Sequence, residues 1–227
     1  MKNTHLIKKN KKGGFTLLEL LIVIAIIAIL SVALVIVLNP AETLKKSRDA
    51  QRISDLSTVK TAIGLYMTSV ANPTLGEGGD NTTCQSTLGT WASGDKIAYS
   101  LPISSLITDT TLDGSSSVVS LQATSPALTN GTGWIPVNFG NISGGSPISN
   151  LPVDPINKIN SLSAVVSTDL VYRYGCSTSP LAYEINAQLE SVAYTVDDDK
   201  RLNDGGNNPN LYETGTNLSI LGIGTDF

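Results

Sequence analysis

The chain has 227 residues, of which 41% are hydrophobic and 15% charged, and its formal net charge is −4. This length fits one domain of common size beside a further segment. Residues 71–227 hold 15 acids and 5 bases, which argues against a bulk attraction of this part to nucleic acid.

Residues 1–14 form a basic leader that we expect to be removed. They contain five lysines and no acid, and positive charge before an apolar span keeps that end on the cytoplasmic side. A secretory signal has its small-residue cleavage site after the apolar region, whereas here Gly13-Gly14 precedes it. A cut between Gly14 and Phe15 would leave the apolar segment on the mature chain, with a new α-amine at Phe15.

Residues 15–38 form an almost unbroken apolar run. As a helix this run would be about 36 Å long, enough to cross a hydrocarbon core of roughly 30 Å. Its polar residues are Thr16, Glu19 and Ser31. A carboxylate so deep in an apolar helix is a candidate functional residue whose partner must be found. The α-amine at Phe15 would lie about one helical turn from Glu19.

The segment from Lys11 to Glu19, KKGGFTLLE, closely resembles the type III signal of the type IV pilin and type II secretion pseudopilin superfamily. The resemblance implies that a membrane-embedded prepilin peptidase cuts after Gly14 and N-methylates Phe15. It also implies that Glu19 pairs with the Phe15 amine of a neighbouring subunit as a filament grows. The implied fold is pilin-like α+β, with a long N-terminal helix of about residues 15–70 packed on a small antiparallel β-rich head with long loops.

Residues 39–70 are expected to form an amphipathic stalk helix. Asn39-Pro40 predicts a kink or short break, because proline lacks a backbone donor but suits the first turn of a new helix after an asparagine cap. Beyond the break, apolar residues recur at steps of three or four, which predicts one buried helix face. These residues are Ile53, Leu56, Val59, Ile63, Tyr66 and Val70.

The stalk also carries a basic cluster with two possible roles. The first role is a solvated helix surface, on which the pair Asp49–Arg52 has the spacing of a weak surface interaction. The second role is contact with the acidic heads of neighbouring subunits. The cluster consists of Lys45, Lys46, Arg48 and Arg52.

Residues 71–227 are rich in Ser, Thr, Gly and Asn with short apolar runs, which predicts a β-rich extracytoplasmic head. Trp134 is expected to pack in the core of the head rather than to make a surface contact. The predicted strands are 117–122, 134–139, 170–174 and 181–189, with weaker signals at 96–101 and 218–223.

Cys84 and Cys176 are the two cysteines of the chain. A head outside the cytoplasmic membrane would lie where disulfides persist, so we expect these cysteines to be bonded to each other. Two buried free thiols are the alternative. Closing so long a loop stabilises a fold by roughly 4–5 kcal/mol on the chain-entropy model.

The sequence predicts a protein that is not an enzyme. Its single histidine, His5, lies in the leader, so the mature chain would lack a Ser/His/Asp triad and a histidine metal cluster. No cofactor is expected, apart from a weak calcium hypothesis. It rests on an oxygen-rich loop whose spacing does not match an EF-hand. The candidate ligands are Asp197, Asp199, Asn203 and Asp204.

The predicted function is structural: a subunit of a type IV pilus-like surface filament. Its expected partners are copies of itself and related pilins, prepilin peptidase, an assembly platform and the membrane. The chain would be single-pass with its N-terminus inside before assembly, and extracellular afterwards. Two alternatives stay open, a pseudopilin of a type II secretion or DNA-uptake apparatus, and a membrane-anchored surface binding domain that never polymerises.

Overall fold

The fold is taken from a computed structural model, which describes residues 13–92, 94–102, 108–109, 118–123, 125–161 and 165–222. The chain divides into two compact units, Met1–Thr43 and Leu44–Phe227. Each unit is described by itself.

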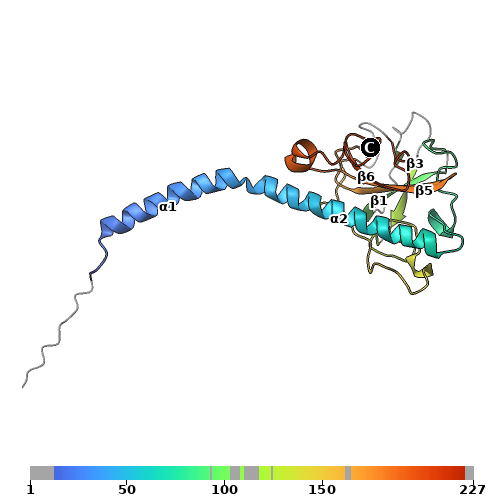
Figure 1. The fold of residues 1–227 in the computed structure, drawn as a ribbon, viewed down its shortest axis with the longest axis horizontal. Helices are drawn as coiled ribbons and strands as arrows, with labels where there is room; N and C mark the ends of the chain where they lie inside the picture. Colours follow the sequence, from blue (N-terminus) through green and yellow to red (C-terminus); the bar gives the residue numbers. More distant parts are fainter. Residues whose placement is uncertain are drawn as a thin grey trace, which may run out of the picture. The chain divides into compact units, whose positions relative to one another are not determined.

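The N-terminal unit contains helix α1, Leu17–Leu38, and the start of helix α2, Pro40–Ser69 (Figure 1). Asn39 separates the two helices in a left-handed conformation, with φ 36°. Its backbone oxygen accepts from the Glu42 and Thr43 amides at 3.0 and 3.2 Å. The predicted break is therefore confirmed, and the long helix runs from Leu17 to Ser69 rather than from 15 to 70.

The second unit is built on a six-stranded sheet of order β2-β3-β1-β4-β5-β6. β1, β4, β5 and β6 are antiparallel neighbours, whereas β3 runs parallel to β1. The layout is the predicted α+β one. The strands are β1 Lys96–Pro102, β2 Thr108–Asp109, β3 Val118–Ala123, β4 Tyr172–Thr178, β5 Leu181–Ala187 and β6 Tyr212–Gly215.

The apolar face of α2 is buried against this sheet. Leu56, Val59, Ile63 and Tyr66 are at most 1% exposed and belong to the main core, which confirms the amphipathic pattern. Tyrosines of β4 and β5 also tie the helix down through their hydroxyls. The Tyr172 hydroxyl donates to Asp55 Oδ2 at 2.8 Å, and the Tyr183 hydroxyl donates to the Lys60 carbonyl at 3.0 Å.

Two strand predictions within the described residues are wrong. Residues 134–139 are deeply buried but run as an irregular segment into the short 3-10 helix η3, Phe139–Asn141. The apolar run correctly predicted that these residues are buried. It did not predict their conformation, because they are covered by packing and are not paired as a strand. Trp134 is fully buried as expected, and its Nε1 donates to the Pro152 carbonyl at 2.8 Å.

The segment 218–222 is also not a strand, and the rest of that prediction, residue 223, lies outside the described residues. Ile220 and Leu221 cover the second face of the sheet with Trp91 and Leu211. Strand β6 went unpredicted, because the sequence Tyr212–Gly215 is polar and short.

The disulfide Cys84–Cys176 is present and spans 92 residues of sequence. It links the loop after α2 to strand β4. The neighbouring Gln85 amide donates to the Cys176 carbonyl at 2.9 Å, so backbone pairing supports the same junction.

Candidate assembly site

Helix α1 begins with a reciprocal cap that engages Glu19. The Glu19 amide donates to Thr16 Oγ1 at 3.2 Å, while Glu19 Oε2 accepts from the Thr16 amide at 2.8 Å and from its hydroxyl at 2.7 Å. This capping box satisfies helix-end donors. Among the described residues, Glu19 Oε1 has no hydrogen-bond partner, so one carboxylate oxygen is available to an outside group.

The rest of α1 presents apolar side chains to its surroundings on every side. No residue of the helix is buried, and apolar side chains such as Leu17 and Val37 are more than 80% exposed. Its one internal hydroxyl, on Ser31, donates to the Ile27 carbonyl at 2.7 Å. By length and composition, Leu17–Ser69 is the one helical stretch among the described residues that qualifies as a membrane span.

Phe15 and the two glycines before it lie in an exposed, non-helical segment. Phe15 is 87% exposed, and a Cβ placed on Gly13 or Gly14 would meet nothing within 4 Å. A protease could therefore take this segment in an extended form without unfolding α1.

A family model described as the prokaryotic N-terminal methylation motif matches residues 9–35. The chain carries a prepilin-type signal. This signal contains Gly14, Phe15 and Glu19, and together with the apolar α1 it indicates membrane anchoring before assembly. Comparisons with curated proteins and with solved structures give no match.

The prepilin-type signal has three general consequences. It implies processing by prepilin peptidase, and it implies assembly into a pilus or a pseudopilus. Proteins that carry this motif are structural subunits rather than enzymes.

A buried ion cluster joins α2 to the head of the prepilin-type chain. Arg52 is fully buried and donates to Asp154 at 2.6 and 3.0 Å, to Asp49 at 2.8 Å and to Glu190 at 2.7 Å. Arg48 donates to Glu190 at 2.8 and 3.0 Å. Burial acts to raise the pKa of Glu190, but the two arginines hold it below its usual range.

This cluster corrects the predicted surface pair Asp49–Arg52, which is buried and not solvated. The i,i+3 spacing predicted the contact, but nothing local showed that Asp154 and Glu190 would close over it. Two members of the basic cluster, Arg48 and Arg52, therefore serve their own head. Lys45 and Lys46 have no ion-pair partner among the described residues.

A buried pair of acidic residues lies on the face of the sheet opposite α2. Glu184 of β5 and Glu213 of β6 are at most 1% exposed. Glu184 Oε2 accepts from the Ile220 and Leu221 amides at 2.8 and 2.9 Å, and Glu213 Oε2 accepts from the Asn208 amide at 2.8 Å. Burial first, and then the neighbouring Glu184 carboxyl, raise the pKa of Glu213 to about 9.

The residues of the calcium hypothesis lie in one loop but use most of their polar atoms within the chain. The Asp199 carboxylate binds Arg201 at 2.7 and 3.0 Å, and the Asn203 side chain donates to the Asp199 carbonyl at 2.6 Å. Asp204 accepts from the Gly206 and Glu213 amides. In the described part of the chain, no group of three or more His, Cys, Asp or Glu side chains is placed to hold a metal ion.

Proposed function

We propose that this chain is a structural subunit of a type IV pilus-like surface filament. One observation carries the proposal: a wholly exposed apolar helix, most of which lies within the prepilin-type signal, holds Glu19 in its first turn. Exposed apolar surface of this extent needs lipid or protein to cover it. In the membrane α1 would be covered by lipid, and in a filament by the same helix of other copies.

Cleavage would create the partner that Glu19 lacks. Hydrolysis of the Gly14–Phe15 peptide bond leaves a carboxylate on Gly14, which departs with residues 1–14, and an α-amine on Phe15. The amine is protonated at neutral pH, and N-methylation keeps its positive charge. Glu19 Oε2 is occupied by Thr16, so the available Oε1 is the atom that a neighbouring copy's amine would reach.

The charge pair would make polymerisation selective for processed chains. A buried carboxylate without a counter-ion is costly, whereas a pair that is also hydrogen-bonded is tolerated. An unprocessed copy would bring five lysines and no amine at Phe15. Only cleaved copies would therefore satisfy Glu19 within an apolar bundle.

The test compares two substitutions at Glu19 with one elsewhere in α1. Glu19→Gln keeps a side chain that can cap the helix but removes its charge, and Glu19→Ala removes both. Because loss of one member of a buried pair costs about 3–5 kcal/mol, both variants should lose surface filaments while their heads stay folded. Ser31→Ala, which removes a hydroxyl bonded within its own helix, should assemble normally.

Mass spectrometry of the wild-type chain recovered from cells accompanies this comparison. The proposal expects a mature N-terminus at N-methylated Phe15 and long fibres that contain this chain. An N-terminus at Met1 would reject it. Processed chains retained with a secretion apparatus, without long fibres, would instead identify a pseudopilin.

A further inference from the structure

The turn η4, Ala193–Asp197, and the residues after it form a compact projection on the head. The Asp198 amide donates to the Ala193 carbonyl at 3.1 Å, and the Lys200 amide donates to the Tyr194 carbonyl at 3.0 Å. The Arg201 guanidinium donates to the Thr195 carbonyl at 2.9 Å. These bonds hold the backbone of the projection in one shape, so they fix where its exposed side chains begin.

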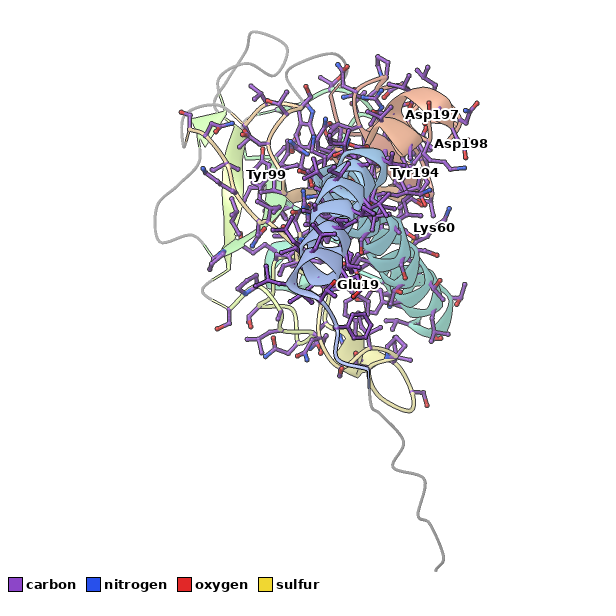
Figure 2. All side chains as sticks on the ribbon, turned by 90° about the vertical axis from the view of Figure 1, so that its left-hand side faces the viewer. Glu19, Lys60, Tyr99, Tyr194, Asp197 and Asp198 are labelled. Atoms are coloured by element: carbon purple, nitrogen blue, oxygen red, sulfur yellow. A yellow bond between two sulfur atoms is a disulfide. The ribbon has the colours of Figure 1, made fainter. Side chains whose placement is uncertain are left out.

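This projection exposes a mixed apolar and acidic surface, which we call the η4 ridge: Val196, Asp197 and Leu202. Val196 is 70% exposed and Leu202 is 64% exposed. The Asp197 carboxylate is exposed and has no hydrogen bond or ion pair among the described residues, whereas the next residue, Asp198, pairs with Lys200. Figure 2 shows Asp197 and Asp198 at the outer end of this turn, beyond Tyr194.

The outward side of α2 offers a surface of opposite character, which we call the α2 face: Ser57, Thr58, Lys60 and Thr61. Lys60 is exposed, and its ammonium group has no partner in the part of the chain that the structure describes. Three other residues of this face help to line a groove of about 260 Å³, whose lining is Ser57, Thr58, Thr61, Ala62, Pro147 and Ile148, and Lys60 precedes Thr61 in the helix. Figure 2 labels Lys60 on the exposed side of α2.

The threonine hydroxyls of this groove are already satisfied. Thr58 donates to the Ser54 carbonyl and Thr61 donates to the Ser57 carbonyl, both at 2.9 Å. An apolar side chain that covers the groove therefore leaves the Thr58 and Thr61 hydroxyls bonded, and burial of its apolar area is favourable. The groove suits an aliphatic side chain that carries an acid next to it, which is the pattern of Val196 and Asp197.

We propose that the η4 ridge of one copy docks on the α2 face of a second copy, with Asp197 paired to Lys60 and Val196 over the groove. This inference rests on the proposed function and names the head-to-head contact of the polymer. The two surfaces are different patches on one chain, so their contact is heterologous. Such a contact repeats from copy to copy without closing when its rotation does not close a ring, which is the geometry of a filament.

The contact is weak by itself. An exposed ion pair contributes little to stability, and a stable interface usually needs more than about 1,000 Å². In the filament, α1 packing supplies the main association and the ridge sets the register of neighbouring heads. The small contribution of each Asp197–Lys60 pair is repeated at every subunit. A polymer with misplaced heads would leave all of these pairs unmade.

A charge swap in cells that make the filament tests the pairing. Asp197→Lys and Lys60→Asp should each reduce filament yield about tenfold, and the double variant with both changes should recover at least half of the wild-type yield. Asp80→Lys and Lys158→Asp reverse exposed charges elsewhere and should leave yield within twofold. All variants should keep the wild-type melting temperature of the head, which separates failed docking from failed folding.

Cross-linking gives a second readout that does not depend on yield. Val196→Cys with Ser57→Cys in one chain should give disulfide-linked ladders in intact filaments, whereas Val196→Cys with Lys158→Cys should not. Absence of wild-type filaments would count against the proposed function itself. If wild-type filaments form, the docking alone would be overturned by any of three results: unaffected single variants, an unrescued double variant, or no specific ladder. An unrescued double variant would also be the result expected if another protein bound the η4 ridge.

Discussion

Helix α1 exposes all of its apolar side chains, whereas the unit of Leu44–Phe227 buries several charged ones. Both arrangements invert the usual preference, in which apolar groups are inside and charges outside. The first inversion requires an external cover, so it indicates assembly or a membrane. The second is met largely within the chain, because Arg52 meets three carboxylates and one oxygen of Glu184 accepts from two backbone amides. Exposed apolar surface thus points to partners here, and buried charge points to internal stability.

The largest expected loss of internal stability comes from removal of the disulfide. Cys84→Ser with Cys176→Ser should destabilise the head by roughly 4–5 kcal/mol, because a 92-residue loop is released in the unfolded chain. Thermal unfolding of the full chain in detergent, followed by near-UV circular dichroism, measures the loss. Wild-type protein treated with a reductant should show a similar change, and an unchanged melting temperature in both would contradict the structural role of the bond.

The next test breaks the buried ion cluster. Arg52→Ala leaves Asp49 and Asp154 buried without a counter-ion, so the free energy of unfolding should fall by about 3–5 kcal/mol. The matched control is Lys96→Ala, which removes a partly exposed ion pair with Glu77 and should cost less than about 1 kcal/mol. Equal losses in the two variants would mean that burial does not set the value of these pairs.

A pair of isoleucines makes the contrast between the two regions direct. Ile63 is fully buried in the core, whereas Ile26 is 52% exposed on α1. Ile63→Ala should destabilise the head by about 2–5 kcal/mol, and Ile26→Ala should leave the melting temperature of the head unchanged. Chemical denaturation of the two variants side by side decides this. A large head destabilisation by Ile26→Ala would show that α1 is part of the folded core.

The features predicted well from sequence are those with short-range signals. Asn39-Pro40 marked the helix break, and the three-to-four spacing of Leu56, Val59 and Ile63 marked the buried face of α2. The cysteine pairing was also predictable, because only two cysteines exist. The assembly role of Glu19, inferred because a single acid interrupts an apolar run, stays a prediction.

The features that were missed depend on contacts between residues far apart in the chain. Arg52 and Asp154 are 102 residues apart, and no local pattern indicates that a stalk arginine will be covered by a loop. Residues 134–139 have the composition of a strand, but packing around Trp134 buries them without strand pairing. The sequence also did not indicate that Glu184 and Glu213 are buried, because the sheet register places them in the interior.

The last test concerns this acidic pair and pH. The folded-state pKa of Glu213 is raised to about 9, and burial also raises the pKa of Glu184. A raised folded-state pKa gives stability that is full below the unfolded pKa of about 4.5 and is lost as pH rises through about 9. Burial and the neighbouring carboxyl both favour the protonated form of Glu213. The head should therefore be more stable at pH 6 than at pH 9.

The variant Glu213→Gln isolates this effect, because an amide can donate to Glu184 without losing a proton. Its melting temperature should change less between pH 6 and pH 9 than that of the wild type. Two other charged groups lie near the pair. Asp204 is in the adjoining loop, and Arg173 of β4 is paired with Asn186 of β5. Asp204→Asn serves as the control, since burial also raises the pKa of Asp204. If Asp204→Asn and not Glu213→Gln flattens the profile, the proton is held by the loop and not by the strand pair.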